Sequence, residues 1–163
     1  MTPRAEIILG MDAQTTGIGW AAIGARTGTP FDAGWLPVRD EGFFERSAML
    51  QIDLIPCTFF GWTVVQLVIE RVGGGRGIQS MLKVADAAGI VSGLAVAKWP
   101  RAELWRPTPS EWKRGFGLSG NAKKDDVRAG VEYRYPDARD LRQDAVDAMA
   151  MAFAGYRTAS EVA

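Results

Sequence analysis

Residues 7–23, IILGMDAQTTGIGWAAI, decide the predicted fold, because an acid and a short polar turn separate two apolar runs. Apolar runs of this kind, bounded by Gly and Thr, are typical of neighbouring strands in a hairpin. The full pattern gives strand, turn, strand, turn and strand at residues 5–12, 13–16, 17–25, 26–32 and 33–38. The chain is therefore predicted to open with a three-strand antiparallel meander whose first strand ends at Asp12.

The remainder of the chain alternates helical patterns with short β-rich runs. Further elements are expected as strands at 63–70 and 101–106, and as helices at 43–61, 78–97, 122–135 and 140–157. Pro56 should kink or restart the first helix. Thr108 and Glu111 have the spacing of a capping box, which should start one more short helix. The order βββαβαβα predicts a single α/β domain over residues 1–163, with a mixed five-stranded sheet and helices on both faces.

The composition is that of an ordinary one-domain globular protein, with 163 residues, 47% hydrophobic and 23% charged. Apolar stretches carry charges or Gly well before the ~20 residues that span a bilayer, and Glu6 interrupts any signal-peptide core. We therefore expect a cytoplasmic protein without a membrane segment. Cys57 is the one cysteine, which excludes an internal disulfide, and it is expected to be an inert buried thiol.

The absence of histidine from the sequence removes several enzyme classes together. A Ser-His-Asp triad, a Cys-His dyad and the usual His-containing zinc sites are excluded. A hydrolase built from this chain must therefore rely on carboxylates, lysines or metal-bound water. Carboxylates suit a hard cation such as Mg²⁺.

Four acids stand beside apolar residues. Asp12 ends the first strand, and Glu70 ends the run VVQLVIE. Asp144 and Asp147 lie three positions apart on the last predicted helix, so they share one face. Each acid also has an ordinary explanation: a turn cap for Asp12, a solvated strand end for Glu70, and a helix start that favours acids for the pair.

Taken together, the four acids indicate a site. Strands 5–12 and 63–70 would be neighbours in a mixed sheet, and a helix covering that sheet could bring its acidic pair over both strand ends. Carboxylates gathered at one spot repel each other unless divalent cations hold them. Two such cations about 3.5–4 Å apart promote phosphoryl hydrolysis, since one activates water and the other stabilises the leaving oxygen. The pattern therefore predicts a metal-dependent hydrolase.

The charge distribution points weakly to nucleic acid. The net charge is zero, yet Lys98 to Arg134 holds nine basic and five acidic residues. A basic half is expected of a protein that binds a phosphate backbone, although solvated faces often look the same. Of the six tryptophans, three are expected in core elements and three lie in this basic half: Trp20, Trp35 and Trp62, and Trp99, Trp105 and Trp112. The second group could stack bases, with core or interface packing the favoured role.

The motifs resemble those of the RuvC family of Holliday junction resolvases, in the right order along nearly the whole chain. IILGMDAQTTGIGWAAI resembles the family's opening strand, acid and hairpin, VVQLVIERV its second acidic strand, and QSMLKVADAAG the helix that follows. RPTPSEWKRGFGLSGNAKKDDVRAGV is similar to its Thr-Pro, Lys, Gly, Ala-x-Lys, Val stretch. DAVDAMAMA closely resembles its terminal paired-aspartate motif. The paired aspartates and the Ala-x-Lys segment are the most specific parts.

The resemblance implies a ribonuclease H-like fold, a homodimer, and symmetric nicking of four-way DNA junctions with two Mg²⁺ or Mn²⁺ ions. It places the metal ligands at Asp12, Glu70, Asp144 and Asp147, with Asp12 bridging both ions. It places a catalytic basic residue near the scissile phosphate at Lys123 or Lys124. The candidate DNA contacts are Arg71, Arg76, Lys83, Lys113, Lys123 and Lys124. Branch-migration proteins, or phage packaging or recombination proteins, would be further partners in a bacterial or phage-infected cell.

Three departures from the family pattern bear on substrate choice. Ala13 and Gln14 replace the usual Pro-Gly after the first acid, which should change the turn but not the ligand. Gly73 stands where the family often places an aromatic wedge, and two further glycines and Arg76 follow it. The near-neutral net charge is lower than the family leads us to expect. Compact phage relatives can prefer branched or flap DNA, so strict junction selectivity is left open.

Other functions remain as alternatives. A nuclease of the same fold could act on flaps or RNA–DNA hybrids. A catalytically silent DNA-binding or assembly module would be favoured had one of the four acids been missing. MDAQTTG also resembles the phosphate-binding hairpin of actin-like and sugar-kinase ATPases, but those proteins need two such domains. Finally, the small residues of helix 78–97 could form either a dimer seam or intradomain packing.

Overall fold

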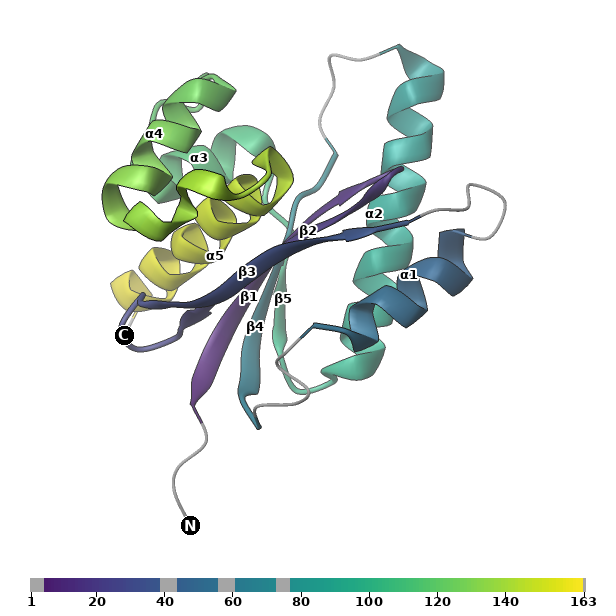
Figure 1. Ribbon diagram of the computed structural model, residues 1–163, viewed down its shortest axis with the longest axis horizontal. Coiled ribbons are helices and arrows are strands. Elements are labelled where there is room, and N and C mark those ends of the chain that lie inside the picture. Colours follow the sequence, from purple (N-terminus) through teal and green to yellow (C-terminus); the bar gives the residue numbers. More distant parts are fainter. Residues whose placement is uncertain (1–4, 39–43, 56–60, 73–76, 163) are drawn as a thin grey trace.

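The computed structural model describes residues 5–38, 44–55, 61–72 and 77–162, which form a sheet covered by helices on both faces (Figure 1). The elements are β1 (Glu6–Gln14), β2 (Gly17–Gly24), β3 (Pro30–Pro37), α1 (Phe44–Asp53), β4 (Thr63–Ile69), α2 (Ile78–Lys98), β5 (Glu103–Trp105), α3 (Pro109–Phe116), α4 (Lys124–Arg134), the 3₁₀ helix η3 (Pro136–Asp140) and α5 (Gln143–Val162).

The predicted mixed sheet of five strands is confirmed, in the order β3-β2-β1-β4-β5. β2 is antiparallel to both β1 and β3, which makes the predicted meander. β4 runs parallel to β1, and β5 runs parallel to β4. β1 is therefore the central strand, and the carboxyl ends of β1 and β4 meet at the same edge of the sheet.

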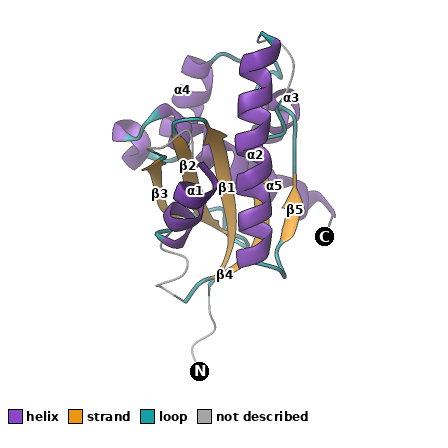
Figure 2. Cartoon of the chain, turned by 90° about the vertical axis from the view of Figure 1, so that its right-hand side faces the viewer, coloured by secondary structure: helices purple, strands orange, loops and turns teal. Residues whose placement is uncertain are grey.

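The two faces of the sheet carry separate cores. Side chains alternate along β1, so Ile7 and Leu9 join the core under α1 and α2, whereas Ile8 joins the core under α3, α4 and α5. Figure 1 shows these two groups of helices on opposite sides of the strands, and Figure 2 looks onto α2 in front of the sheet. A site built on one face is therefore separated by the sheet from residues on the other.

Helix α5 lies directly on two glycines of the sheet. A methyl group on Gly10 of β1 would overlap the backbone of Ala148 and Ala152. A methyl group on Gly19 of β2 would overlap the backbone of Asp144. The absence of a side chain at both positions allows the helix backbone to approach the strands, and this contact fixes where the start of α5 lies.

Several element boundaries differ from the predicted ones for local reasons. β1 continues through Gln14, so the hairpin turn is shorter than predicted, and β3 already begins at Pro30. α1 ends at Asp53, so the helix predicted over 43–61 is wrong beyond that residue, and Cys57 lies outside the described residues. The sequence pattern also missed η3, which Pro136 starts.

The predicted capping box at the start of α3 is confirmed. The Thr108 hydroxyl accepts a hydrogen bond from the Glu111 backbone N–H at 3.4 Å, and the Glu111 carboxylate accepts one from the Thr108 backbone N–H at 2.6 Å. The helix ends at Gly117, whose φ of 101° is left-handed and favours glycine. The cap fixes the position of Trp112 and Lys113, which lie in the middle of this short helix.

The tryptophans follow the predictions with one exception. Trp20 is buried and Trp62 packs against the same core. Trp112, from the basic half, is buried in the core on the α5 side. The prediction that Trp35 lies in the core is wrong, because its half-buried ring lies outside both core clusters and under the guanidinium of Arg142.

Within the described residues, one segment, Gln79–Lys98 of α2, is long and apolar enough to cross a membrane by length and composition alone. The segment does carry the interrupting charges and glycines that the sequence analysis pointed to, among them Lys83, Asp86 and Gly89. Its inner stripe, which includes Ala88, Val91 and Ala95, packs into the core on the sheet. This packing explains why that stripe is apolar. It does not explain the apolar residues on the outer face of α2, which are exposed.

Candidate metal-binding nuclease site

Asp12 and Glu70 lie side by side at the carboxyl ends of two neighbouring parallel strands. Met11 of β1 is paired with Ile69 of β4, and each acid is the next residue along the chain. Asp12 is 6% exposed, and Glu70 is half-buried just beyond the end of β4. The predicted meeting of these two strand-end acids is confirmed.

Helix α5 brings the paired aspartates of its first turns to the same edge. The backbone of Asp144 lies on Gly19, which is paired with Asp12 across β1 and β2. Asp147 follows three residues later and lines one cavity together with the acids at the strand ends. The carboxylate charges of Asp144 and Asp147 both raise the pKa of Asp12, so the acidic groups interact through space.

A cavity of about 180 Å³ lies where these elements meet. It is lined by three acids, two lysines and four other residues: Asp12, Glu70, Asp147, Lys113, Lys124, Gln14, Pro109, Trp112 and Val127. Asp144 is not among the lining residues, so of the four predicted acids three share the cavity and the fourth lies beside it. The lining combines negative groups that bind cations with positive groups that bind phosphate.

Each of the three cavity acids accepts a hydrogen bond from a neighbouring N–H donor. The Gln14 amide donates to Asp12 at 2.8 Å, and the Trp112 indole donates to Glu70 at 2.6 Å. The Gln143 amide donates to Asp147 at 2.8 Å. Such partners orient carboxylates that bind metals.

Arg128 of α4 in turn holds Gln143, the residue that donates to Asp147. Its guanidinium donates to the Gln143 side-chain oxygen at 3.2 Å and to the Leu141 carbonyl at 3.0 Å. The same group bonds the Arg139 carbonyl at 3.4 Å. Arg128 therefore joins α4 to the start of α5 and holds Gln143 against Asp147.

The electrostatics of the site disfavour several negative charges in the absence of cations. Burial, together with the charges of Glu70, Asp147 and Asp144, raises the pKa of Asp12 to about 8, although the hydrogen bond from Gln14 opposes this shift. Burial also raises the pKa of Asp147, while Gln143 and the Lys124 charge lower it. A divalent cation between these carboxylates would stabilise their charged forms and so lower these pKa values.

The donor set fits hard divalent cations that keep part of their water shell. Among the described residues, no three acidic or thiol side chains form a ready-made metal cluster as they stand. Mg²⁺ is commonly held by only one or two carboxylates together with water and substrate phosphate, so a ring of three is not required. Asp12, Glu70 and Asp147 all line the one cavity, which is therefore the place where such a cation would bind. The metal-ligand roles of the four acids stay predictions.

The predicted basic residues separate into those at the cavity and those away from it. Lys113 and Lys124 line the cavity, and Lys113 is held by a hydrogen bond to the Ala122 carbonyl at 2.7 Å. Lys123 is exposed at the start of α4 and does not line the cavity. The structure therefore favours Lys124 over Lys123 as the basic residue beside the acids.

The other three predicted DNA contacts lie elsewhere. Arg71 is exposed next to Glu70, with its guanidinium 3.8 Å from the Glu111 carboxylate. Lys83 is exposed on α2, which covers the opposite face of the sheet from α5. Arg76 and Gly73, the position of the missing wedge, lie outside the described residues.

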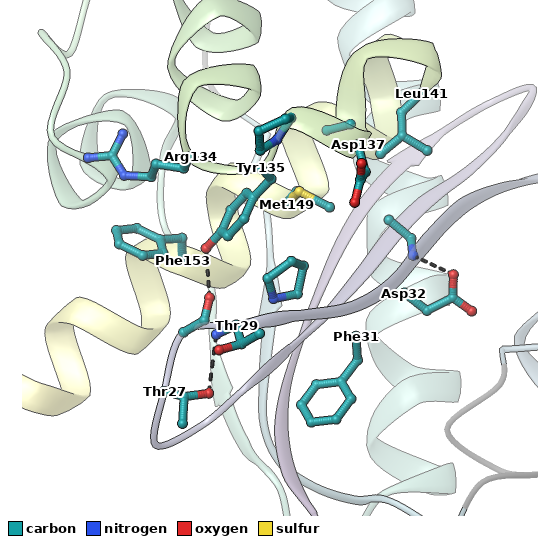
Figure 3. A pocket seen from close by; sticks show the side chains of 15 residues that line it. Thr27, Thr29, Phe31, Asp32, Arg134, Tyr135, Asp137, Leu141, Met149 and Phe153 are labelled. Atoms are coloured by element: carbon teal, nitrogen blue, oxygen red, sulfur yellow. Dashed lines mark hydrogen bonds between the residues drawn. The ribbon is translucent and has the colours of Figure 1, made fainter.

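A second, larger cavity of about 710 Å³ lies between the β2–β3 turn and the segment from Arg134 to Leu141 (Figure 3). The Tyr135 hydroxyl donates to the Gly28 carbonyl at 2.8 Å and ties this segment to the turn. Burial raises the pKa of Tyr135 to about 12, so the hydroxyl keeps its proton. None of the four predicted acids lines this cavity, so its size does not make it the reaction site.

Three polar residues of the site were missed by the sequence analysis. Gln14 was seen only as a departure in the turn, Trp112 only as a packing or base-stacking residue, and Gln143 not at all. Gln14 offered a signal, because a residue two positions after a strand-end acid points to the same face. Trp112 and Gln143 depend on how the helices pack and carried no comparable signal.

A five-stranded mixed sheet in this order, with acids at adjacent strand ends and on the covering helix, places the chain in the ribonuclease H-like class of folds. The family model of crossover junction endodeoxyribonuclease RuvC matches residues 8–155. A crossover junction endodeoxyribonuclease RuvC from Porphyromonas gingivalis is 30% identical over 158 residues, which cover 93% of this chain and 82% of that protein. The chain belongs to the RuvC family of crossover junction endodeoxyribonucleases.

Solved structures support the fold. RuvC from Thermus thermophilus has a TM-score of 0.74 at 15% identity, with 96% of each chain covered. The same protein in complex with a Holliday junction substrate gives 0.73 at 15% identity and the same coverage. The yeast mitochondrial Holliday junction resolvase gives 0.60 at 13% identity, covering 99% of this chain and 84% of that one. The ribonuclease H-like fold is therefore confirmed.

The raised pKa of Asp12 predicts how the metal-free protein responds to pH. The folded state retains a proton on Asp12 up to about pH 8, whereas the unfolded chain loses it near pH 4. Stability should therefore fall as pH rises through this interval and level off above it. Asp12→Asn removes this loss and should raise the free energy of unfolding by roughly 1–3 kcal/mol at pH 8, with a smaller gain at pH 5.

Urea unfolding of both proteins in EDTA at the two pH values measures this difference. Asp86→Asn, which changes an exposed carboxylate on α2, is the matched control. A gain from Asp12→Asn that is the same at pH 5 and pH 8 would contradict the proposed repulsion.

Proposed function

We propose that this chain is a structure-selective endonuclease that resolves four-way DNA junctions by paired symmetric nicks, through phosphodiester hydrolysis with two Mg²⁺ ions for which Mn²⁺ can substitute. The observation that carries the proposal is the meeting of Asp12, Glu70 and Asp147 around a single cavity with Lys113 and Lys124. Family membership supports it, since the matching model and relative are crossover junction endodeoxyribonucleases. The Thermus thermophilus complex, whose title names a Holliday junction substrate, supports the substrate class.

The acids divide the work of cation binding according to their positions. Asp12, on the central strand, lies between Glu70 on β4 and the α5 pair, so it is the residue suited to contact both cations. Glu70 and Asp147 would each complete one cation site, with Asp144 supporting the second from beside the cavity. Cations bound there supply water activation and neutralise charge at the scissile phosphate. The Trp112 and Gln143 hydrogen bonds keep the Glu70 and Asp147 carboxylates directed toward the cavity.

The two cavity lysines act on the substrate side. Lys113 has its ammonium fixed by the Ala122 carbonyl and lies 5.6 Å from the centre of the Trp112 ring. Lys124, in the first turn of α4, lines the same cavity as Asp147, and its charge lowers the pKa of that carboxyl group. Both ammonium groups are placed to stabilise the negative charge that grows on the phosphate during hydrolysis.

Paired nicks require two sites, and each chain offers one such cavity, so we propose a homodimer. The outer face of α2 is the surface that supports it. Leu82, Gly89, Gly93 and Val96 follow helical spacing along one face, and Leu82 and Val96 are 54% and 38% exposed. Apart from the adjoining backbone of α2 itself, no atom of the described residues lies within 4 Å of a methyl group placed on either glycine. An apolar face with small residues allows a second copy of the helix to pack closely.

The remaining features of the proposal follow from the family and the sequence. The chain works as one nuclease domain in the cytoplasm of a bacterial or phage-infected cell. Branch-migration, packaging or recombination proteins would deliver its DNA. Flap and RNA–DNA hybrid cleavage remain alternative activities of the same cavity, and substrate comparison distinguishes them.

Purified protein with Mg²⁺ should cut a synthetic four-way junction by paired nicks, and faster than flap, duplex or RNA–DNA hybrid substrates. Asp12→Asn, Glu70→Gln or Asp147→Asn should reduce the rate by at least about 100-fold, because each removes a cation ligand, while the junction is still bound. Gel assays of cleavage and of binding measure the two effects. Preference for a flap or hybrid would overturn the junction proposal, and full cleavage by any variant would remove that carboxylate from the mechanism.

Substitutions of the adjacent residues Lys123 and Lys124 should have different effects on the cleavage rate. Lys124→Ala is expected to lower kcat by about 10–100-fold, because it removes a positive charge at the cavity. Lys123→Ala, the matched neighbour, should change kcat by less than about threefold, because this exposed side chain does not line the cavity. Single-turnover rates on the junction measure both. An equal loss of kcat in the two variants would contradict the assignment of Lys124, rather than Lys123, to the cavity.

The dimer proposal is tested by two substitutions of Gly93, a glycine on the outer face of α2. Gly93→Ala should stabilise an isolated helix by about 1 kcal/mol, and the chain itself leaves room for the methyl group. Gly93→Glu should leave the fold intact but disrupt close helix contact and yield a monomer that nicks one strand at a time. Sedimentation equilibrium and the ratio of single to paired nicks measure this. A Gly93→Glu dimer with paired nicks would exclude this face as the seam.

A further inference from the structure

We propose that Arg142, stacked on the ring of Trp35, binds the phosphate backbone of the DNA strand on the β3 side of the cavity. This contact rests on the proposed function, since it concerns how the same site holds its DNA. Neither residue belongs to the segments from which DNA contacts were predicted. Both were found through the structure, because Arg142 and Trp35 are far apart in sequence and meet only when α5 docks on the sheet.

The register of the sheet places Trp35 in line with the catalytic carboxylate. Asp12 of β1 pairs with Gly19 of β2, and Gly19 pairs with Trp35 of β3. Paired residues on neighbouring strands direct their side chains to the same face, so Trp35 faces α5 as Asp12 does. Two strand spacings separate them, which amounts to about 10 Å.

Arg142 covers this ring from the start of α5. It immediately precedes Gln143, the first residue of the helix. Its guanidinium carbon lies 3.8 Å from the centre of the Trp35 ring. At this distance the planar guanidinium contacts the face of the ring, which is the favourable cation–π arrangement.

The Arg142 side chain is exposed and makes no ion pair or hydrogen bond to another described residue. All five of its N–H donors are therefore available to a ligand from outside. Arg128 differs in this respect, because its guanidinium donates hydrogen bonds to Gln143, Leu141 and Arg139. Of these two arginines near the start of α5, one supports the structure and the other faces solvent.

The tryptophan ring serves as a fixed platform for the arginine. A methyl group on Gly17 would overlap the Trp35 ring, so the ring packs tightly on β2. Its indole N–H is buried and has no hydrogen-bond partner among the described residues. A buried donor without a partner is unfavourable, so the ring is held at this position by packing and by the cation above it.

A matching arrangement lies on the other flank of the acids. Lys113 lies 5.6 Å from the centre of the Trp112 ring, and Trp112 donates to Glu70. The carboxylates are therefore bordered by a tryptophan with a cation on the β4 side and by another on the β3 side. Arg142 would therefore contact a backbone phosphate close to the scissile one, on the β3 side of the cavity. Because Arg142 covers the Trp35 ring, phosphate binding is favoured over base stacking there.

The test compares Arg142→Ala, Arg142→Lys, Trp35→Phe and Trp35→Leu on a synthetic four-way junction. Binding is measured at several salt concentrations in the Glu70→Gln background, and kcat and KM are measured in the otherwise unmodified protein. Arg101→Ala is the matched control, since this exposed arginine precedes β5 at the opposite edge of the sheet from the acids. Thermal unfolding of every variant identifies any loss of folded protein.

Arg142→Ala should raise KM and the junction Kd by about tenfold, leave kcat within about twofold, and reduce the salt slope by about 1. Arg142→Lys should keep the salt slope and lose part of the affinity, because an ammonium stacks less well. Trp35→Phe should bind as the unmodified protein does, and Trp35→Leu should lose affinity as Arg142→Ala does.

Wild-type affinity and salt slope for Arg142→Ala, in a protein that cleaves junctions, would overturn the Arg142 contact. A loss of affinity as large in Arg101→Ala would overturn it too, because position would then not matter. Unmodified protein that neither binds nor cuts the junction would overturn the proposed function itself, which is a separate result.

Discussion

The contact between the backbone of α5 and two glycines of the sheet is the constraint on which the site depends. Gly10 and Gly19 leave space that any side chain would fill, and the helix backbone occupies it. Because the helix lies this close, Asp144 rests on the strand paired with Asp12 and Asp147 reaches the cavity. With larger residues at these glycines, α5 would stand farther from the strands, and the acids of helix and sheet would not share one cavity.

This close packing carries an electrostatic cost that the surrounding residues only partly offset. Burial and three neighbouring acids raise the pKa of Asp12 to about 8. One N–H donor for each cavity acid, from Gln14, Trp112 or Gln143, orients the carboxylates without neutralising them. Neutral donors keep the net negative charge of the group, whereas arginines in the same places would have satisfied it within the protein. The arrangement therefore retains its attraction for external cations.

The sequence predicted the acids because strands and helix starts have strong local signals. Asp12 and Glu70 end apolar runs, and parallel neighbours bring strand ends together, so their meeting follows from topology. The Trp112 contact with Glu70 depends on how α3 lies against the sheet, and no local pattern encodes that. Trp35 was misplaced because an apolar aromatic in a strand usually indicates the core. Its position follows from β3 being the edge strand of the sheet, and its contact with Arg142 forms only in the folded chain.

The zero net charge does not conflict with DNA binding once the positions of the charges are considered. Charges separated by more than about 8–10 Å are largely screened at physiological salt, so distant acids such as Asp86 on α2 or Glu103 on β5 contribute little at the cavity. The phosphate backbone would instead contact a row of charged groups that crosses the sheet. This row consists of Arg142 on Trp35, the acids with their cations, and Lys113 on Trp112. Affinity is thereby concentrated around the reacting phosphate. A chain of this charge should bind DNA weakly over most of its surface, and selectivity then depends on whether a substrate can reach the cavity and both flanks together.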